Sequence, residues 1–420
     1  MESTVKENFI NYIFVSLILA SYLFGFYFNE DSAGGGEVDL MASEWNNLIL
    51  FKQNSIIEAL TSLEFRSSRT PLFVIIHKYN LFADSIQGFR ATTFVTGLAV
   101  HLFFYLCLCL YFPKIKKSLL LLTSSLILLS PYFRSSVFWA NQEHLAILFF
   151  ILSLIFLKLG NQNTGLNYKK ILSCLFAFLS FYSDQKFFFT PIIVYFYSMK
   201  DLDFKFFLSF SLVNFLFFFP TIFLFILWGG IVPIESQFRI SFTPSNFNIL
   251  ISSLGVYFIP IFLFTLFNKN ITIPKLKKND FIIFIILALL ALFFLPSNPV
   301  KEGSGIVFRL LSVIYLKNNF INWNFLTIIY FFINLIFIYL MIITLKKTIK
   351  NLILISCLSL IYSMTYFTYQ SYVDPLAFLL IYLLFDMNRN VLIDRKFIFL
   401  NGFFFAAILL SSILFRNYII

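Results

Sequence analysis

The chain has 420 residues, of which 60% are hydrophobic and 12% are charged. Soluble globular domains carry about 45–50% apolar and about 25% charged residues, so this composition excludes an ordinary soluble protein and indicates an integral membrane protein. The formal net charge of +11 would by itself suit a nucleic-acid-binding surface. The Lys and Arg residues of a membrane protein, however, also collect on its cytoplasmic side.

The first apolar run covers residues 9–28 and is long enough to cross a bilayer, which takes about 20 residues. It ends in aromatic residues and lacks the small residues of a cleavage site, so we expect a retained membrane anchor. Further apolar runs follow at 94–112, 118–130, 145–157, 171–182, 187–199, 206–228, 249–267, 280–295, 326–345, 351–368, 375–387 and 397–415. The pattern predicts an all-α, polytopic integral membrane protein with about 11–13 transmembrane helices. We expect one transmembrane domain over 1–420 and no separate soluble domain.

The charge of the connecting segments predicts the orientation. If the N-terminus is cytoplasmic, most of the 31 Lys and Arg residues lie on the cytoplasmic side and most of the 20 Asp and Glu residues on the other. The positive-inside rule supports this orientation, in a cell inner (plasma) membrane. It places the three long loops, 29–93, 229–248 and 296–325, on the extracytoplasmic face, where we expect the functional residues. Topology thus explains the basic charge, and we expect no nucleic-acid partner.

The first of these loops, 29–93, opens with a strongly acidic stretch that contains three consecutive glycines, Gly34–Gly36. Asp31 and Asp39 flank the glycines just beyond the first span, where a carboxylate could take a proton from a substrate hydroxyl. Glycine N–H groups can approach an anionic ligand closely, whereas a flexible solvated connector is the alternative interpretation. From Leu40 onward, apolar residues recur at helical spacing, which predicts helices lying in the membrane interface.

Other polar side chains of the same face are candidates for substrate binding. Arg66 and Arg69 suit a phosphate, which arginine meets in bidentate geometry, although anchoring to lipid headgroups is an alternative. Asp184 and Lys186 lie within apolar sequence, where a lone charge is costly, so they line a wet cavity or pair with each other. The candidate substrate-binding residues are Glu30, Glu37, Arg66, Arg69, Arg134, Glu143, Asp184, Lys186 and Arg309.

The order of these features resembles that of the GT-C-fold glycosyltransferases, such as the mannosyl- and aminoarabinosyltransferases that take sugars from polyprenyl-phosphate carriers. The shared features are the first span, a far-side loop that opens on the acidic Asn29–Asp31, and the return of the chain to the membrane at Ser68–Leu72. The resemblance implies a polyprenyl-phosphate-linked sugar donor, a glycan or lipid acceptor, and contact with membrane lipids.

The resemblance also implies residue roles. Asp31 is the leading candidate for the catalytic base and Asp39 the second, while Arg66 and Arg69 would hold the carrier phosphate. Carboxylates of this loop can also position a divalent metal in the family, so a metal is an open alternative as cofactor, with no ligands assigned. We expect a transferase of single sugars, since no soluble C-terminal domain is predicted.

Two other classes of protein share this composition. A transporter or flippase for lipid-linked sugars would also be polytopic, but transporters often carry internal repeats and ionisable positions at mid-membrane. We find no convincing repeat, and the charged residues gather near the far-side ends of the apolar runs. An O-antigen polymerase or ligase usually concentrates its arginines in a large late loop, whereas the largest loop here comes first. A glycosyltransferase is therefore the favoured expectation.

Overall fold

The computed structural model describes residues 2–65, 71–162, 165–199, 204–233, 236, 241–268, 277–297, 305–317, 322–346, 349–365 and 370–418. The all-α prediction is confirmed, because these residues form helices and contain no β-strand beyond one isolated bridge between Leu345 and Met387. The chain divides into two compact units, Met1–Phe238 with Ala406–Ile420, and Arg239–Phe405. We describe each unit by itself.

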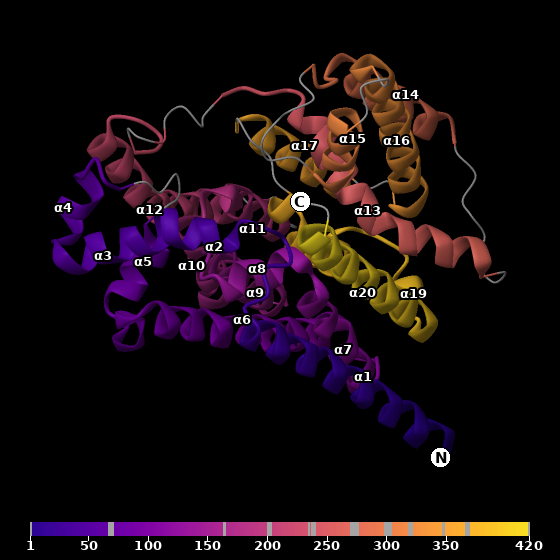
Figure 1. The fold of residues 1–420 in the computed structure, drawn as a ribbon, viewed down its shortest axis with the longest axis horizontal. Helices are drawn as coiled ribbons and strands as arrows, with labels where there is room; N and C mark the ends of the chain where they lie inside the picture. The colour runs from indigo at the N-terminus through magenta and orange to yellow at the C-terminus, as the bar shows by residue number, and fades with distance from the viewer. Residues whose placement is uncertain are drawn as a thin grey trace. The chain divides into compact units, whose positions relative to one another are not determined.

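Unit 1 holds the first span, the first loop and the helices that follow them (Figure 1). In its centre α9 packs between α6 and α10, and α1 lies along α7. The elements are α1 Glu2–Tyr27, α2 Gly36–Asp39, η1 Leu40–Glu44, α3 Trp45–Gln53, α4 Ile56–Thr61, α5 Leu72–Lys78, η2 Leu81–Asp84, α6 Ile86–Tyr111, α7 Lys117–Ser125, η3 Leu126–Leu129, α8 Pro131–Phe138, α9 Glu143–Gly160, α10 Tyr168–Ser183, η4 Gln185–Phe188, α11 Phe189–Ser198 and α12 Phe204–Trp228.

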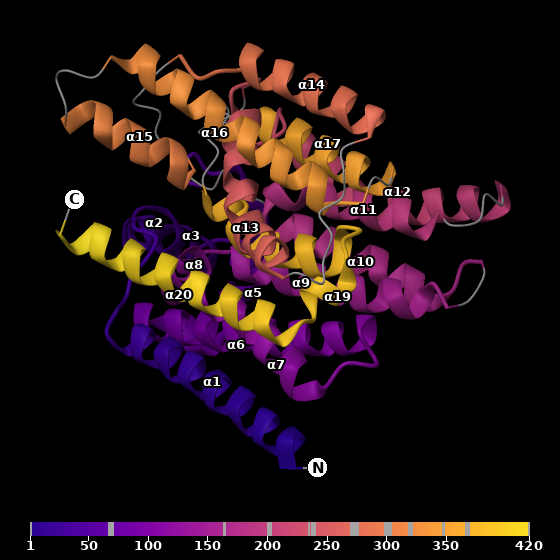
Figure 2. The ribbon, with the colours of Figure 1, turned by 90° about the vertical axis from the view of Figure 1, so that its right-hand side faces the viewer.

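Unit 2 is built around α13, which packs against α15, α16 and α17, while α14 packs on α16 (Figure 2). Gly255 of α13 lies against the ring of Phe337 of α16, so the two helices approach closely there. The elements are α13 Asn246–Phe267, α14 Lys278–Phe293, α15 Ile306–Lys317, α16 Trp323–Thr344, α17 Ile349–Ser363, η6 Gln370–Tyr372, α18 Asp374–Leu379, η7 Leu380–Leu384, α19 Arg389–Leu392 and α20 Arg395–Tyr418, whose last residues belong to unit 1.

Seven helices in the described residues are long and apolar enough to cross a membrane, which is consistent with a polytopic membrane protein. The other apolar runs also form helices, but none of these exceeds 16 residues. A helix of that length rises about 24 Å, less than the hydrocarbon core of about 30 Å. The seven spanning segments are Lys6–Tyr27, Ile86–Tyr111, Glu143–Gly160, Phe204–Trp228, Asn246–Phe267, Trp323–Thr344 and Arg395–Phe415.

A bent pair of helices, Lys117–Leu129 and Pro131–Phe138, meets at 70° and is either one broken span, which would make an eighth crossing, or a re-entrant loop. The bend falls at Ser130, whose side chain accepts the N–H of Phe133 and so starts a new helix. Before the pair, Lys116 bonds Glu7 near the start of α1 at 2.7 Å. After the bend, α8 reaches the residues just beyond the other end of α1. The pair therefore runs alongside α1 from near its start to just beyond its end, which favours a broken span over a re-entrant loop.

The first loop is helical, as its spacing of apolar residues predicts. A nearly continuous helix runs from Gly36 to Gln53 and buries Leu40, Leu48 and Phe51. It contains a π-helical turn at Leu40–Glu44, an irregularity that is common at functional sites. The loop thus forms a folded layer of unit 1.

Candidate active site

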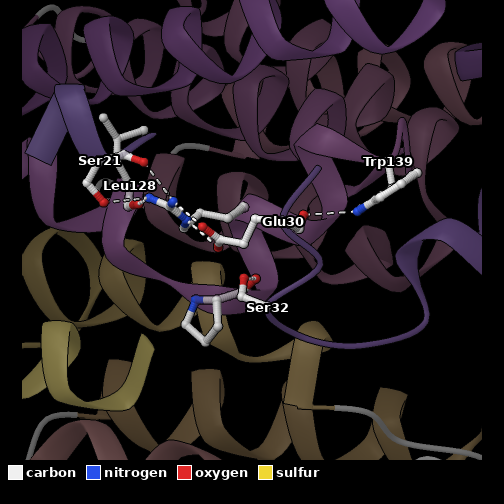
Figure 3. A network of polar contacts seen from close by, with 7 residues as sticks. Ser21, Glu30, Ser32, Leu128 and Trp139 are labelled. Carbon is white, nitrogen blue, oxygen red and sulfur yellow. Dashed lines mark hydrogen bonds and ion pairs between the residues drawn. The ribbon is translucent and has the colours of Figure 1, made fainter. Parts of the chain in front are cut away.

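A buried ion pair joins the start of the first loop to α8. The carboxylate of Glu30 accepts two hydrogen bonds from Arg134, one of them from Nε to Oε1 at 2.8 Å. The remaining guanidinium N–H groups donate to Ser21 Oγ, to the Ser21 carbonyl and to the Leu128 carbonyl at 2.9–3.3 Å (Figure 3). Arg134 is 1% exposed. All five of its donors are occupied, so Arg134 has none left for another ligand.

The backbone around this pair is adapted to it. Gly25 of α1 leaves room for the ion pair. A Cβ at this position would stand 2.5 Å from Glu30 Oε2 and 2.9 Å from the Phe138 ring, too close for either contact. After α1, Asn29 adopts φ 54, the left-handed conformation that lets the chain turn sharply before Glu30. A second residue with positive φ, Ala140 at 53, follows α8. Both positions flank the polar cluster, and backbone strain of this kind concentrates at functional sites.

Asp31, the leading base candidate, is held next to the ion pair. Its Oδ1 accepts a hydrogen bond from the Ser135 hydroxyl of α8, and its Oδ2 accepts the N–H of Glu37 at 3.4 Å. The glycines make this contact possible. Gly35 has φ +90, and a Cβ on Gly36 would stand 2.7 Å from Ser135 Oγ. The stretch therefore brings Asp31 onto α8, in contrast to a loose connector.

Arg90 is a member of this cluster that the sequence reasoning missed. It lies in the first turns of α6 and is 9% exposed. Its Nε donates to the Phe138 carbonyl at 2.7 Å, and its guanidinium stacks 4.0 Å from the Trp139 ring centroid. Trp139 in turn donates its indole N–H to the Glu30 carbonyl at 3.0 Å (Figure 3). The only sequence signal for Arg90 was a lone arginine just before the apolar run that was predicted to begin at residue 94.

A second buried group of charges lies at the start of α9. Lys186 contacts Glu143 at 2.8 Å and Asp184 at 3.1 Å, and Ser136 donates to Glu143 at 3.1 Å. Of the two alternatives for Asp184 and Lys186, the structure shows the mutual pair, while their expected role in binding substrate stays a prediction. Glu143 completes the group, so its three charges largely satisfy one another inside the helix bundle.

Beside this group lie polar side chains that have no hydrogen-bond partner within the described residues. Gln142 and His144 are fully buried, and both polar atoms of each are unpartnered. The ring of Phe73 contacts both His144 and His77. Burial lowers the pKa of His77 to about 4, with a smaller contribution from the positive charge of Lys52. His77 is therefore neutral at physiological pH.

The remaining candidates are dispersed. Asp39 and Glu37 are exposed on α2, and Arg309 is exposed on α15 of unit 2. Arg66 and Arg69 lie outside the described residues, so their expected role in holding a phosphate stays a prediction.

A divalent metal would need several protein ligands in one place. Within the described ranges, no group of three or more His, Cys, Asp or Glu side chains is arranged to hold a metal ion. Asp31 is the best-placed carboxylate, but the neighbouring carboxylate of Glu30 is already bound by Arg134. The donors among the described residues therefore do not fit a metal ion.

No protein-family model, no curated protein and no solved structure matches this chain. Its function is therefore inferred from its own side chains.

Proposed function

We propose that the protein is a membrane glycosyltransferase that moves a sugar from a polyprenyl-phosphate carrier to a hydroxyl of a glycan or lipid. The observation that carries the proposal is the position of Asp31. Its carboxylate lies just beyond the end of the first apolar helix, oriented by Ser135 and the Glu37 N–H. A general base needs such a fixed orientation at a site that a substrate hydroxyl can reach.

The proposed reaction is a direct displacement. The acceptor oxygen attacks the anomeric carbon of the donor sugar while Asp31 takes the hydroxyl proton. The bond between that carbon and the phosphate oxygen breaks, and the lipid phosphate leaves with the bonding electron pair. Direct displacement gives inversion at the anomeric carbon. Positive charge near the departing phosphate stabilises the transition state.

The proposal includes a membrane arrangement. The chain would lie in the inner (plasma) membrane with its N-terminus in the cytoplasm and Asp31 on the extracytoplasmic face, in contact with membrane lipids. Besides the seven long helices and the bent pair, the helical segments α10, η4 with α11, α14, α17, and α18 with η7 would cross as short or tilted spans. That arrangement reaches the upper end of the count of about 11–13.

The test uses purified protein and its Asp31→Asn variant, each incubated with a panel of polyprenyl-phosphate sugars, with donor consumption measured by mass spectrometry. Wild-type protein should consume at least one donor, and the variant none, while both accumulate equally in the membrane. Asp39→Asn tests the second candidate base, which is exposed on α2, and a loss of consumption in that variant alone would move the role of base to Asp39. No consumption of any donor, together with movement of lipid-linked sugar across liposomes, would replace the proposal by a transporter or flippase.

A further inference from the structure

Arg90 carries a buried charge that has no ion-pair partner within the described residues. One of its five donors bonds the Phe138 carbonyl, and the Trp139 ring covers one face of the guanidinium. Nη2 is buried and makes no hydrogen bond to any part of the chain that the structure describes. The exposed carboxylate of Glu37 acts on Arg90 electrostatically but forms no ion pair with it.

The contrast with Arg134 is informative. Both arginines are at least nine-tenths buried in the same cluster, yet Arg134 has a carboxylate partner in Glu30 and no unused donor. A buried cation without a counter-ion is strongly unfavourable, because its lost hydration is not compensated. The charge of Arg90 is therefore offset only from a distance by Glu37, and its Nη2 lacks an acceptor within the described residues.

We propose that Arg90 is the guanidinium that binds a phosphoryl oxyanion of the substrate. This inference rests on the proposed function and assigns it a phosphate-binding residue. A guanidinium held by stacking presents its donor edge in a fixed plane, and phosphate oxygens accept such donors in pairs. Arg90 and Asp31 both contact the short segment that contains Ser135, Phe138 and Trp139, so a phosphate on Arg90 would lie in the cluster that contains the base.

Two sources could supply this phosphoryl group, the polyprenyl-phosphate carrier and an anionic phospholipid headgroup. The binding test uses polyprenyl phosphate without a sugar, so that it does not depend on transfer. Native mass spectrometry would follow its binding to wild-type protein and to Arg90→Gln, with polyprenol as the uncharged probe and phosphatidylglycerol as a competitor. Arg389→Gln is the control, since it removes the same charge from an exposed position on α19.

Arg90→Gln should weaken polyprenyl phosphate binding at least about tenfold and leave polyprenol binding unchanged, while Arg389→Gln binds as wild type. Efficient displacement by phosphatidylglycerol would assign the site to lipid headgroups and would still support a phosphoryl site. Equal binding by wild type and Arg90→Gln would overturn the assignment even if the protein transfers sugar. Arg90-dependent binding without any transfer would keep the phosphate site and reject the transferase.

The substitution could also destabilise the fold, because Arg90 packs beside Trp139 and Phe26. A photoreactive polyprenyl phosphate whose diazirine is next to the phosphate provides a measurement on wild-type protein. Cross-links within residues 86–94 or 134–141 would support the proposal. Cross-links confined to other segments would contradict it whether or not the variant folds.

Discussion

The indole N–H of Trp139 donates to the backbone carbonyl of Glu30, and the face of the same ring carries the guanidinium of Arg90. Trp139→Phe keeps an aromatic ring but removes this donor. We expect it to destabilise the protein by about 1 kcal/mol, the usual net contribution of one hydrogen bond. The readout is the thermal unfolding midpoint in detergent.

Trp323 provides the matched control for that prediction. It is also buried, but its indole N–H has no hydrogen-bond partner among the described residues. Trp323→Phe should therefore lower the midpoint less than Trp139→Phe does. The reverse order would show that the contact with Glu30 contributes nothing to stability.

Breaking the ion pair at the end of α1 should be much more damaging. Glu30→Gln leaves the Arg134 charge buried without a counter-ion, which costs about 3–5 kcal/mol in comparable pairs. We expect a large loss of monodisperse protein in fluorescence-detected gel filtration, partly recovered when Arg134→Met is added to Glu30→Gln. Glu7→Gln, which breaks the exposed pair with Lys116, should change little. Equal behaviour of Glu30→Gln and Glu7→Gln would contradict this account.

Ser135 positions Asp31, and its removal should be visible in the kinetics. Ser135→Ala deletes the hydroxyl that donates to Asp31. We expect kcat for transfer to fall about tenfold or more, as when an orienting hydrogen bond is lost, with KM for the donor nearly unchanged. Ser136→Ala, which removes the contact with Glu143, is the neighbouring control. A rise in KM at constant kcat would instead indicate that Ser135 helps to bind the donor.

Stability should fall as the pH is lowered, because His77 stays neutral in the folded protein. Its pKa is about 4 when folded and 6.5 in the reference state, so the unfolded chain binds the proton more readily between these values. The loss, about 3 kcal/mol in total, develops from near pH 6.5 downward and levels off near pH 4. The measurement compares unfolding midpoints of wild type and His77→Phe across this range. Parallel pH curves would exclude His77 as the origin.

The broken span makes a topological prediction. If α7 and α8 together cross the membrane once and α9 returns, reporters inserted after Lys117 and after Gln162 should lie on the same side. Positive charge predicts that this side is the cytoplasm. Reporters on opposite sides would mean that α7 and α8 form a re-entrant loop. A periplasmic score at both positions would invert the whole orientation.

The sequence predicted the helical class, because long apolar runs can be recognised without knowledge of tertiary contacts. The sequence could not predict that Arg134 forms an ion pair with Glu30, because the two residues are 104 positions apart and only tertiary folding brings them together. Arg90 was missed for a related reason. Hydropathy places the start of the second span at residue 94, whereas the helix begins at Ile86 and so includes a charged residue in its first turns.

The predicted count of about 11–13 spans is larger than the seven described helices that are long enough to cross a membrane. Apolar runs were counted one by one, but a run such as 171–182 becomes the 16-residue helix α10, which packs against α9. A buried helix in a bundle and a short membrane span have the same composition, so periodicity alone does not separate them. Packing partners decide between them, and these appear only in the folded chain.

The wide separation of Glu30 and Arg134 also has a consequence for biosynthesis. Arg134 follows Glu30 by 104 positions in the sequence. At an elongation rate of about 5–20 residues per second, Arg134 is therefore synthesised about 5–20 s after Glu30. During that interval α1 is already in the membrane with an unneutralised carboxylate at its end. When α8 leaves the ribosome, Arg134 can pair with the carboxylate of Glu30, which is already at the end of α1. The insertion of this bent segment is therefore expected to depend on the earlier helix, and a chain without α1 should fail to integrate α8.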